Sequence, residues 1–171
     1  MIKVSYWTRW CDGFNSGVAP LTERQARSRH KRKKLYAAYL ANDAGNDLFI
    51  HVCATDCIQV NFLDEQKRCA LFHGYDLLPE GRLFLDDATE HVYRGDERDV
   101  HWGRWFSYKQ DGSLWVRQSR MISPFGTDYV VDVSDHYIAP VPPFGEYEPF
   151  LRRDRHALPP DLPPAPHFAP K

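Results

Sequence analysis

Residues 101–138 restrict the fold more than any other segment, because they have the pattern of a β-hairpin followed by a third strand. Asp111-Gly112 lies between two runs rich in aromatic and β-branched residues, and such a dipeptide favours a hairpin turn because glycine accepts a positive φ. Alternation along the second strand places Leu114 and Val116 on one face and Trp115 on the other. The hairpin therefore predicts both the register and the buried face.

The rest of the ordered chain has mostly strand-like alternation. Strand patterns occur at 3–10, 48–62 (one strand or two), 69–75, 83–85 and 89–94, with Asp86-Asp87 interrupting the last two. Their short connections favour an antiparallel sheet, since parallel pairs need long crossovers. We therefore expect an α+β fold in which an antiparallel sheet of about seven strands packs against one main helix.

The expected helix begins at Thr22, where Thr22 and Gln25 have capping-box spacing, and it runs to about Ala41. We expect it to cover the face of the sheet that holds Val116, Val131 and Val133. Trp115 should then lie on the opposite face, beneath the chain's tail or a partner.

Proline divides the chain into two parts. Ten of its 13 prolines lie in the last 32 residues, which indicates a single domain over 1–150 and a proline-rich, irregular tail over 151–171. Within this proline-rich region, residues 140–150 still carry apolar side chains and are expected to lie ordered against the domain.

Composition excludes several classes of protein. The 171 residues are 43% hydrophobic and carry a net charge of −1, so the chain is neither disordered nor a polyanion binder by bulk charge. Its start lacks the pattern of a secretory leader, and no apolar run is long enough to span a membrane. We interpret the four cysteines as reduced thiols and expect a cytoplasmic protein.

One metal-binding set is conceivable. It consists of His51, Cys53, Cys57, Cys69 and His73, which are residue types that bind zinc. The set lacks the paired spacing of zinc knuckles, and buried cysteine is common as a small apolar residue, so we predict no metal and no cofactor.

No motif indicates catalysis. Ser134-Asp135-His136 contains the residue types of a triad, but neighbours on a strand point to opposite faces and cannot form one. We interpret it as part of a polar outer face and predict that the protein is not an enzyme. A small enzyme that uses unrecognised carboxylates or histidines is the third alternative, and it would need a deep polar pocket.

Opposite charges are segregated along the chain. Residues 23–34 carry +6, which leaves −7 on the remainder, including an acidic group formed by Asp86, Asp87, Asp96, Glu97 and Asp99. The cations suggest a nucleic-acid contact through Arg29, Lys31, Arg32, Lys33 and Lys34 within the basic segment Arg24–Lys34. The alternatives are a solvated helix surface and a helix that lies over the acidic sheet.

In overall character, residues 1–150 resemble the small cytosolic immunity proteins that neutralise bacterial effector toxins. Residues 6–10 (Tyr-Trp-Thr-Arg-Trp) and 111–116 (Asp-Gly-Ser-Leu-Trp-Val) carry this resemblance. It implies a single-domain antidote that occludes a cognate protein toxin. The aromatic surplus fits protein binding, because Trp, Tyr and Arg dominate interface hot spots. We predict that Trp115 and the acidic group contact the toxin.

Overall fold

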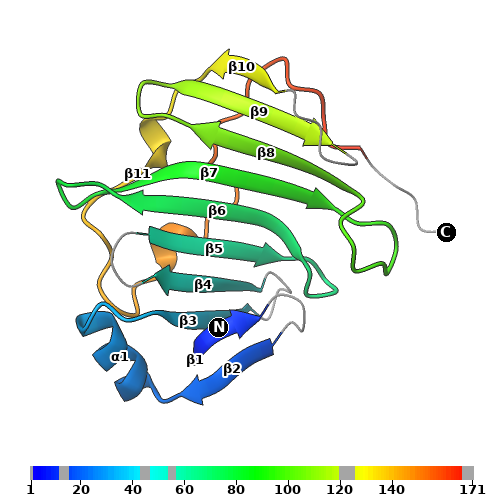
Figure 1. Cartoon of the computed structure of the whole chain (residues 1–171). Helices are drawn as coiled ribbons and strands as arrows, with labels where there is room; N and C mark the ends of the chain where they lie inside the picture. The colour runs from blue at the N-terminus through cyan, green and yellow to red at the C-terminus, as the bar shows by residue number, and fades with distance from the viewer. Residues whose placement is uncertain (1, 12–15, 43–46, 54–56, 120–125, 167–171) are drawn as a thin grey trace.

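The described residues fold into one antiparallel sheet of eleven strands with a single α-helix at its edge (Figure 1). The computed structural model describes residues 2–11, 16–42, 47–53, 57–119 and 126–166. The strands are β1 (Ile2–Cys11), β2 (Ser16–Leu21), β3 (Tyr36–Asn42), β4 (Leu48–Cys53), β5 (Cys57–Leu63), β6 (Cys69–Leu77), β7 (Leu83–Val92), β8 (Trp102–Tyr108), β9 (Ser113–Ser119), β10 (Thr127–Val130) and β11 (Tyr137–Ile138). Their spatial order is β10-β9-β8-β7-β6-β5-β4-β3-β1-β2, and β11 pairs with β7. The sheet is therefore larger than the predicted seven strands.

The helix is shorter than predicted. α1 (Glu23–Lys31) begins with the expected capping box, in which the Thr22 hydroxyl accepts a hydrogen bond from the Gln25 backbone amide. The prediction that it continues to Ala41 is wrong, because Lys33 adopts a positive φ of 52° and turns the chain back. The following residues form β3, which inserts between β1 and β4 and turns Tyr36 and Leu40 into the core.

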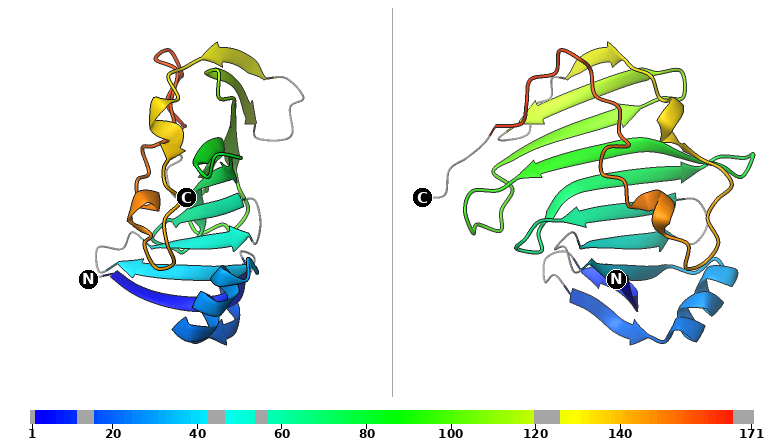
Figure 2. Two further views of the ribbon diagram at one scale, coloured as in Figure 1. Left: turned by 90° about the vertical axis from the view of Figure 1, so that its left-hand side faces the viewer. Right: turned by 180° about the vertical axis from the view of Figure 1, so that it is seen from behind.

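The helix does not cover the sheet, which corrects a second prediction. Figure 2 shows that residues 131–166, here called the C-terminal segment, run across one face of the sheet. This segment contains two short 3₁₀ helices, η2 (Ser134–His136) and η3 (Glu148–Phe150), besides β11. Its side chains complete both apolar cores: Ile138, Tyr147 and Phe150 join the core over β3–β7, and Val133 joins the core over β8 and β9.

Polar contacts from the sheet hold the second half of the C-terminal segment. The Tyr108 hydroxyl donates to the Ala157 carbonyl at 2.7 Å, and the Ala157 amide donates to His136 Nε2 at 3.0 Å. Arg104 Nη1 donates to the Pro163 carbonyl at 2.6 Å. A proline-rich segment cannot form the regular backbone hydrogen bonds of a strand, because proline lacks an N–H group. The bonds from Tyr108, His136 and Arg104 take their place and hold residues as far as Pro163 against the sheet.

Strand β7 is continuous through the predicted interruption. The register shifts at Asp86, because Gly74 pairs with Asp87 and Tyr75 pairs with Leu85. On its other side, β7 pairs first with β11, at Leu83 and Phe84, and then with β8 from Asp87 onward. Asp86 thus lies in a β-bulge at the point where β7 changes partners, a position typical of irregularities in large sheets.

The hairpin at Asp111-Gly112 is confirmed. Tyr108 pairs with Leu114, and Gly112 has a φ of 87° with no room for a Cβ, which would lie 2.6 Å from the Val131 carbonyl oxygen. Leu114 and Val116 enter the core with Val133, and Val131 packs against that core half-buried. The prediction that Val116 and Val133 are core residues is therefore confirmed, whereas Val131 is only half-buried and the helix does not cover this core.

Candidate partner-binding surface

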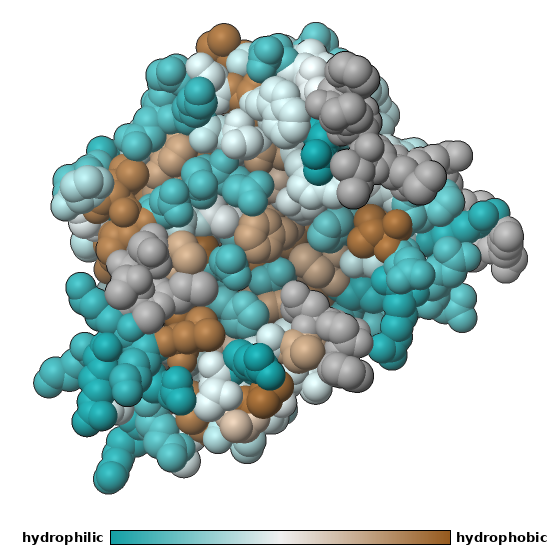
Figure 3. All heavy atoms as spheres, in the orientation of Figure 1, coloured by the Kyte–Doolittle hydropathy of each residue, from teal (hydrophilic) through white to brown (hydrophobic). Residues whose placement is uncertain are grey.

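The face of the sheet opposite the C-terminal segment, here called the open face, is turned toward the viewer in Figure 1. Strand register aligns its side chains in rows that cross the sheet. One row contains Phe49, Asn61, Phe72, Thr89, Trp105 and Arg117, and the next contains Gln59, Gly74, Asp87, Ser107, Trp115 and Asp128. Figure 3 shows apolar, intermediate and hydrophilic side chains side by side on this face.

Two tryptophan rings pack closely against glycine residues on the open face. A Cβ at Gly103 would lie 2.9 Å from the Trp105 ring, and a Cβ at Gly126 would lie 2.2 Å from the Trp115 ring. The missing side chains therefore let each indole rest against neighbouring backbone. Because this contact fixes the rings, the indoles form rigid apolar surfaces, and Trp115 remains 37% exposed.

Arg117 lies between these two rings. Its guanidinium carbon is 4.9 Å from the Trp105 ring centroid and 5.9 Å from that of Trp115, distances at which cation–π attraction operates. Among the described residues, its Nε finds no hydrogen-bond partner. Trp105, Arg117 and Trp115, here called the Trp–Arg–Trp cluster, thus join two aromatic planes to one cation.

Carboxyl groups lie beside this cluster. Asp87 occupies the same row as Trp115, with Ser107 between them. Burial, followed by the negative charges of Asp76 and Asp87, raises the pKa of Asp86 to about 6, and burial also raises the pKa of Asp87. The fold therefore keeps two acidic groups where their charged forms are unfavourable, which is a feature of functional sites as well as of structural networks.

The predicted acidic group separates into two parts. Asp96, Glu97 and Asp99 are exposed in the loop between β7 and β8, whereas Asp87 lies about 17 Å from the end of β7 at ~3.3 Å per residue. Arg68 holds this loop by donating to the carbonyls of Gly95 and Glu97, at 2.8 and 2.7 Å. The loop is therefore separate from Asp87, and its three carboxylates lie beside the cations of Arg68, Arg94 and Arg98.

The possible metal set does not assemble. His51 lies on the open face, where its Nε2 accepts a hydrogen bond from the Trp10 amide at 2.9 Å, whereas His73 lies in the core beneath the C-terminal segment. The Cys69 thiol donates to Asn61 Oδ1 at 3.5 Å, and the side chain of Cys53 lies outside the described residues. In the part of the chain that the structure describes, no group of three His, Cys, Asp or Glu residues could hold a metal ion.

Ser134-Asp135-His136 is a 3₁₀ helix rather than part of a strand. His136 is fully buried, which corrects the interpretation of a polar outer face. Its Nδ1 binds the Leu85 carbonyl at 2.7 Å and its Nε2 accepts from the Ala157 amide, so both ring nitrogens serve the fold.

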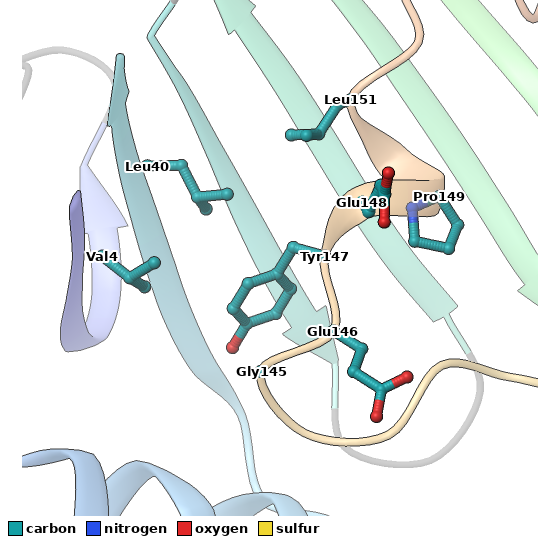
Figure 4. A pocket seen from close by; sticks show the side chains of 8 residues that line it. All are labelled: Val4, Leu40, Gly145, Glu146, Tyr147, Glu148, Pro149 and Leu151. Carbon is teal, nitrogen blue, oxygen red and sulfur yellow. The ribbon is translucent and has the colours of Figure 1, made fainter. Parts of the chain in front are cut away.

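A cavity of about 680 Å³ opens between the sheet edge and the C-terminal segment (Figure 4). Val4 and Leu40 line it from the strands, and Tyr147 and Leu151 line it from the segment, so its walls include apolar side chains from both sides. The side chains of Glu146 and Glu148 also border it.

The basic residues remain at the surface of α1 and the turn after it. Arg29 is half-buried, whereas Lys31, Arg32, Lys33 and Lys34 are exposed. Among the described residues, the ion pair on this helix is local, between Arg27 and Glu23, and none joins the helix to an acidic group of the sheet. The hypothesis of a helix lying over the acidic sheet therefore finds no support in the contacts.

Trp105 and Arg117 were absent from the predicted site. The hairpin pattern contained the necessary signal, because a turn at Asp111-Gly112 pairs these two residues and alternation puts them on the face of Trp115.

Comparisons with protein-family models, curated proteins and solved structures find no match to this chain. No helix among the described residues is long and apolar enough to cross a membrane.

Proposed function

We propose that the protein binds a protein partner through the open face, with the Trp–Arg–Trp cluster at the centre of the contact. The observation that carries the proposal is the Trp115 ring, which is 37% exposed and whose centroid lies 5.9 Å from the Arg117 guanidinium carbon. Tryptophan and arginine contribute most of the energy in many protein interfaces. Rings already held against glycine lose little conformational freedom when a partner binds.

The surrounding charges favour a basic partner. Asp128 pairs with Trp115, and Asp87 lies two strands away in the same row. In the loop between β7 and β8, the carboxylates of Asp96, Glu97 and Asp99 outnumber the cations of Arg94 and Arg98. Complementary charge accelerates association and selects among partners. A cognate effector toxin with a basic cleft fits this chemistry, and the protein would then act as its antidote by occluding that cleft.

Affinity capture from the native host tests the proposal. We compare the wild-type protein, a Trp105→Ala/Trp115→Ala variant and a Trp7→Ala variant, because Trp7 also lies against a glycine but belongs to the other end of the sheet. Quantitative mass spectrometry should find one protein enriched by wild type and by Trp7→Ala, and reduced at least tenfold with the double variant.

Matched thermal unfolding curves show whether all three proteins are folded. Equal capture by the double variant would place the interface elsewhere. Recovery of nucleic acid without a protein partner would contradict protein binding.

A further inference from the structure

A second surface lies at the opposite edge of the sheet, on α1. Gln25, Ser28, Arg29 and Arg32 follow one another at intervals of three, one and three residues, so they form a single stripe along the helix and its cap. This stripe, together with Leu21 and Lys34, lines a cavity of about 270 Å³. Figure 3 shows the hydrophilic side chains that gather over α1, at the lower left.

The turn after the helix completes this cavity. The positive φ of Lys33 reverses the chain, and the Lys34 amide donates to the Arg29 carbonyl at 2.8 Å. The Arg29 guanidinium is fixed in turn by its hydrogen bond to the Leu35 carbonyl, at 2.8 Å. Three cations from different turns of the chain therefore converge on one space, and Arg29 is held in place before any ligand arrives.

The local charge balance favours an anion. The cavity is lined by three cationic side chains and by the polar groups of Gln25 and Ser28, and no carboxylate is among its lining residues. The carboxyl end of a helix carries about half a negative charge, which opposes anion binding. Three full positive charges outweigh it, and the Ser28, Arg29 and His30 carbonyls already accept hydrogen bonds from the capping turn.

We infer that this cavity, here called the α1 pocket, binds the phosphoryl group of a phosphate-bearing ligand. Arginine supplies a planar donor fork for phosphate oxygens, lysine supplies a point charge, and Ser28 and Gln25 supply neutral donors. The phosphoryl group can belong to a nucleic-acid backbone or to a small polyphosphate. The site is separate from the partner-binding surface, because α1 packs beside β2 whereas Trp115 lies near the β10 edge.

Two charge-matched variants test this inference. The pocket variant carries Arg29→Gln, Arg32→Gln and Lys34→Gln, and the control carries Arg24→Gln, Lys31→Gln and Lys33→Gln, which remove the same charge from residues outside the cavity lining. Calorimetry with pyrophosphate and fluorescence anisotropy with a labelled single-stranded DNA oligonucleotide are run at 50 and 200 mM salt. Unfolding curves verify that both variants fold.

The pocket variant should bind at least one probe tenfold more weakly than wild type, and the control variant less than threefold. Dependence on the pocket residues for DNA alone identifies a nucleic-acid backbone, and dependence for pyrophosphate alone identifies a small polyphosphate. Equal weakening by both variants means diffuse attraction to a charged surface and overturns the inference. The absence of binding to either probe by the wild-type protein also overturns it.

Discussion

His73 Nε2 and His156 Nδ1 lie 3.0 Å apart, and this contact joins the middle of the sheet to the C-terminal segment. His73 is fully buried on β6, and His156 Nε2 lies 3.5 Å from a carboxylate oxygen of Glu90. Glu90 also accepts a hydrogen bond from Arg104, which binds the Pro163 carbonyl. A connected polar network beneath the C-terminal segment therefore fixes its position on the sheet.

This network predicts a loss of stability in acid. Burial, followed by the neighbouring positive groups, lowers the pKa of His73 to about 2 from its ordinary value near 6.5. Below pH 6.5, His73 therefore binds a proton in the unfolded chain but stays neutral in the folded chain. The contribution of His73 to the free energy of unfolding is present above pH 6.5 and is lost as the pH falls toward 2. Between pH 7.5 and 5, the free energy of unfolding should fall by about 2 kcal/mol from this residue.

Urea denaturation at the two pH values measures this difference in the wild-type protein and in a His73→Leu variant. The variant should lose the part of the pH dependence that comes from His73, because leucine does not titrate. An undiminished slope in His73→Leu would assign the acid sensitivity to other groups.

Asp86 should show the opposite sign. Its pKa is raised to about 6, so the folded chain holds a proton more tightly than the unfolded chain, and this contribution is lost as the pH rises through 6. Asp86→Asn should therefore stabilise the protein at pH 8 by about 1 kcal/mol, a value reduced for solvent screening because the carboxyl is partly exposed. The gain should vanish at pH 3.5, where the wild-type carboxyl is protonated in both states.

Asp99→Asn, at an exposed loop position, provides the matched control. An equal gain in stability from Asp99→Asn at pH 8 would show that the effect comes from net charge rather than from the bulge.

Adjacent residues of β9 should respond very differently to substitution. Val116 is 3% exposed in the core, so Val116→Asp buries an unpaired charge and should lower the free energy of unfolding by roughly 3 kcal/mol or more. Val131→Asp should cost less, because Val131 is only half-buried. Trp115→Ala should also cost less than Val116→Asp, because Trp115 is 37% exposed on the open face and its truncation buries no charge. Urea denaturation curves of the three variants measure these differences, and similar losses from Val116→Asp and Trp115→Ala would contradict the assignment of faces.

Removal of the chain after Asp154 should destabilise the protein strongly. It deletes Arg155 and His156, together with the Ala157 and Pro163 backbone groups that His136, Tyr108 and Arg104 bind. We expect a loss of roughly 3 kcal/mol or more, equivalent to a fall in Tm of about 10 °C. Removal of the last five residues is the control, since none of the hydrogen bonds described above involves them. Equal melting of the two truncated chains would contradict a structural role for the C-terminal segment.

The sequence carried part of this fold in local signals. Asp111-Gly112 defined the hairpin, because its turn chemistry and the alternation beside it agree. Residues 35–40 were ambiguous: Leu35, Tyr36, Tyr39 and Leu40 match helical spacing, and Tyr36, Ala38 and Leu40 match a strand. Residues 36–42 form a strand because they pair with β1 and β4. This pairing cannot be read from the local pattern.

Sequence patterns also could not predict that the C-terminal segment covers one face of the sheet. The C-terminal segment has no hydrophobic period, and it is held by single hydrogen bonds to residues such as Tyr108 and Arg104, far away in the chain. The face of Trp115 was predictable from alternation. Its contact with Gly126 was not, because it depends on how β9 and the chain before β10 meet.

Site-specific photo-crosslinking tests the central claim, the binding of a protein partner on the open face, most directly. A photoreactive phenylalanine replaces Ser107, which is exposed in the row of Trp115, or Leu158, which is 48% exposed on the C-terminal segment. Each protein is irradiated in a lysate of the native host, and the adducts are identified by mass spectrometry. We expect a single dominant protein adduct from position 107 and none of that species from position 158. The same adduct from position 158, or no protein adduct from position 107, would contradict it.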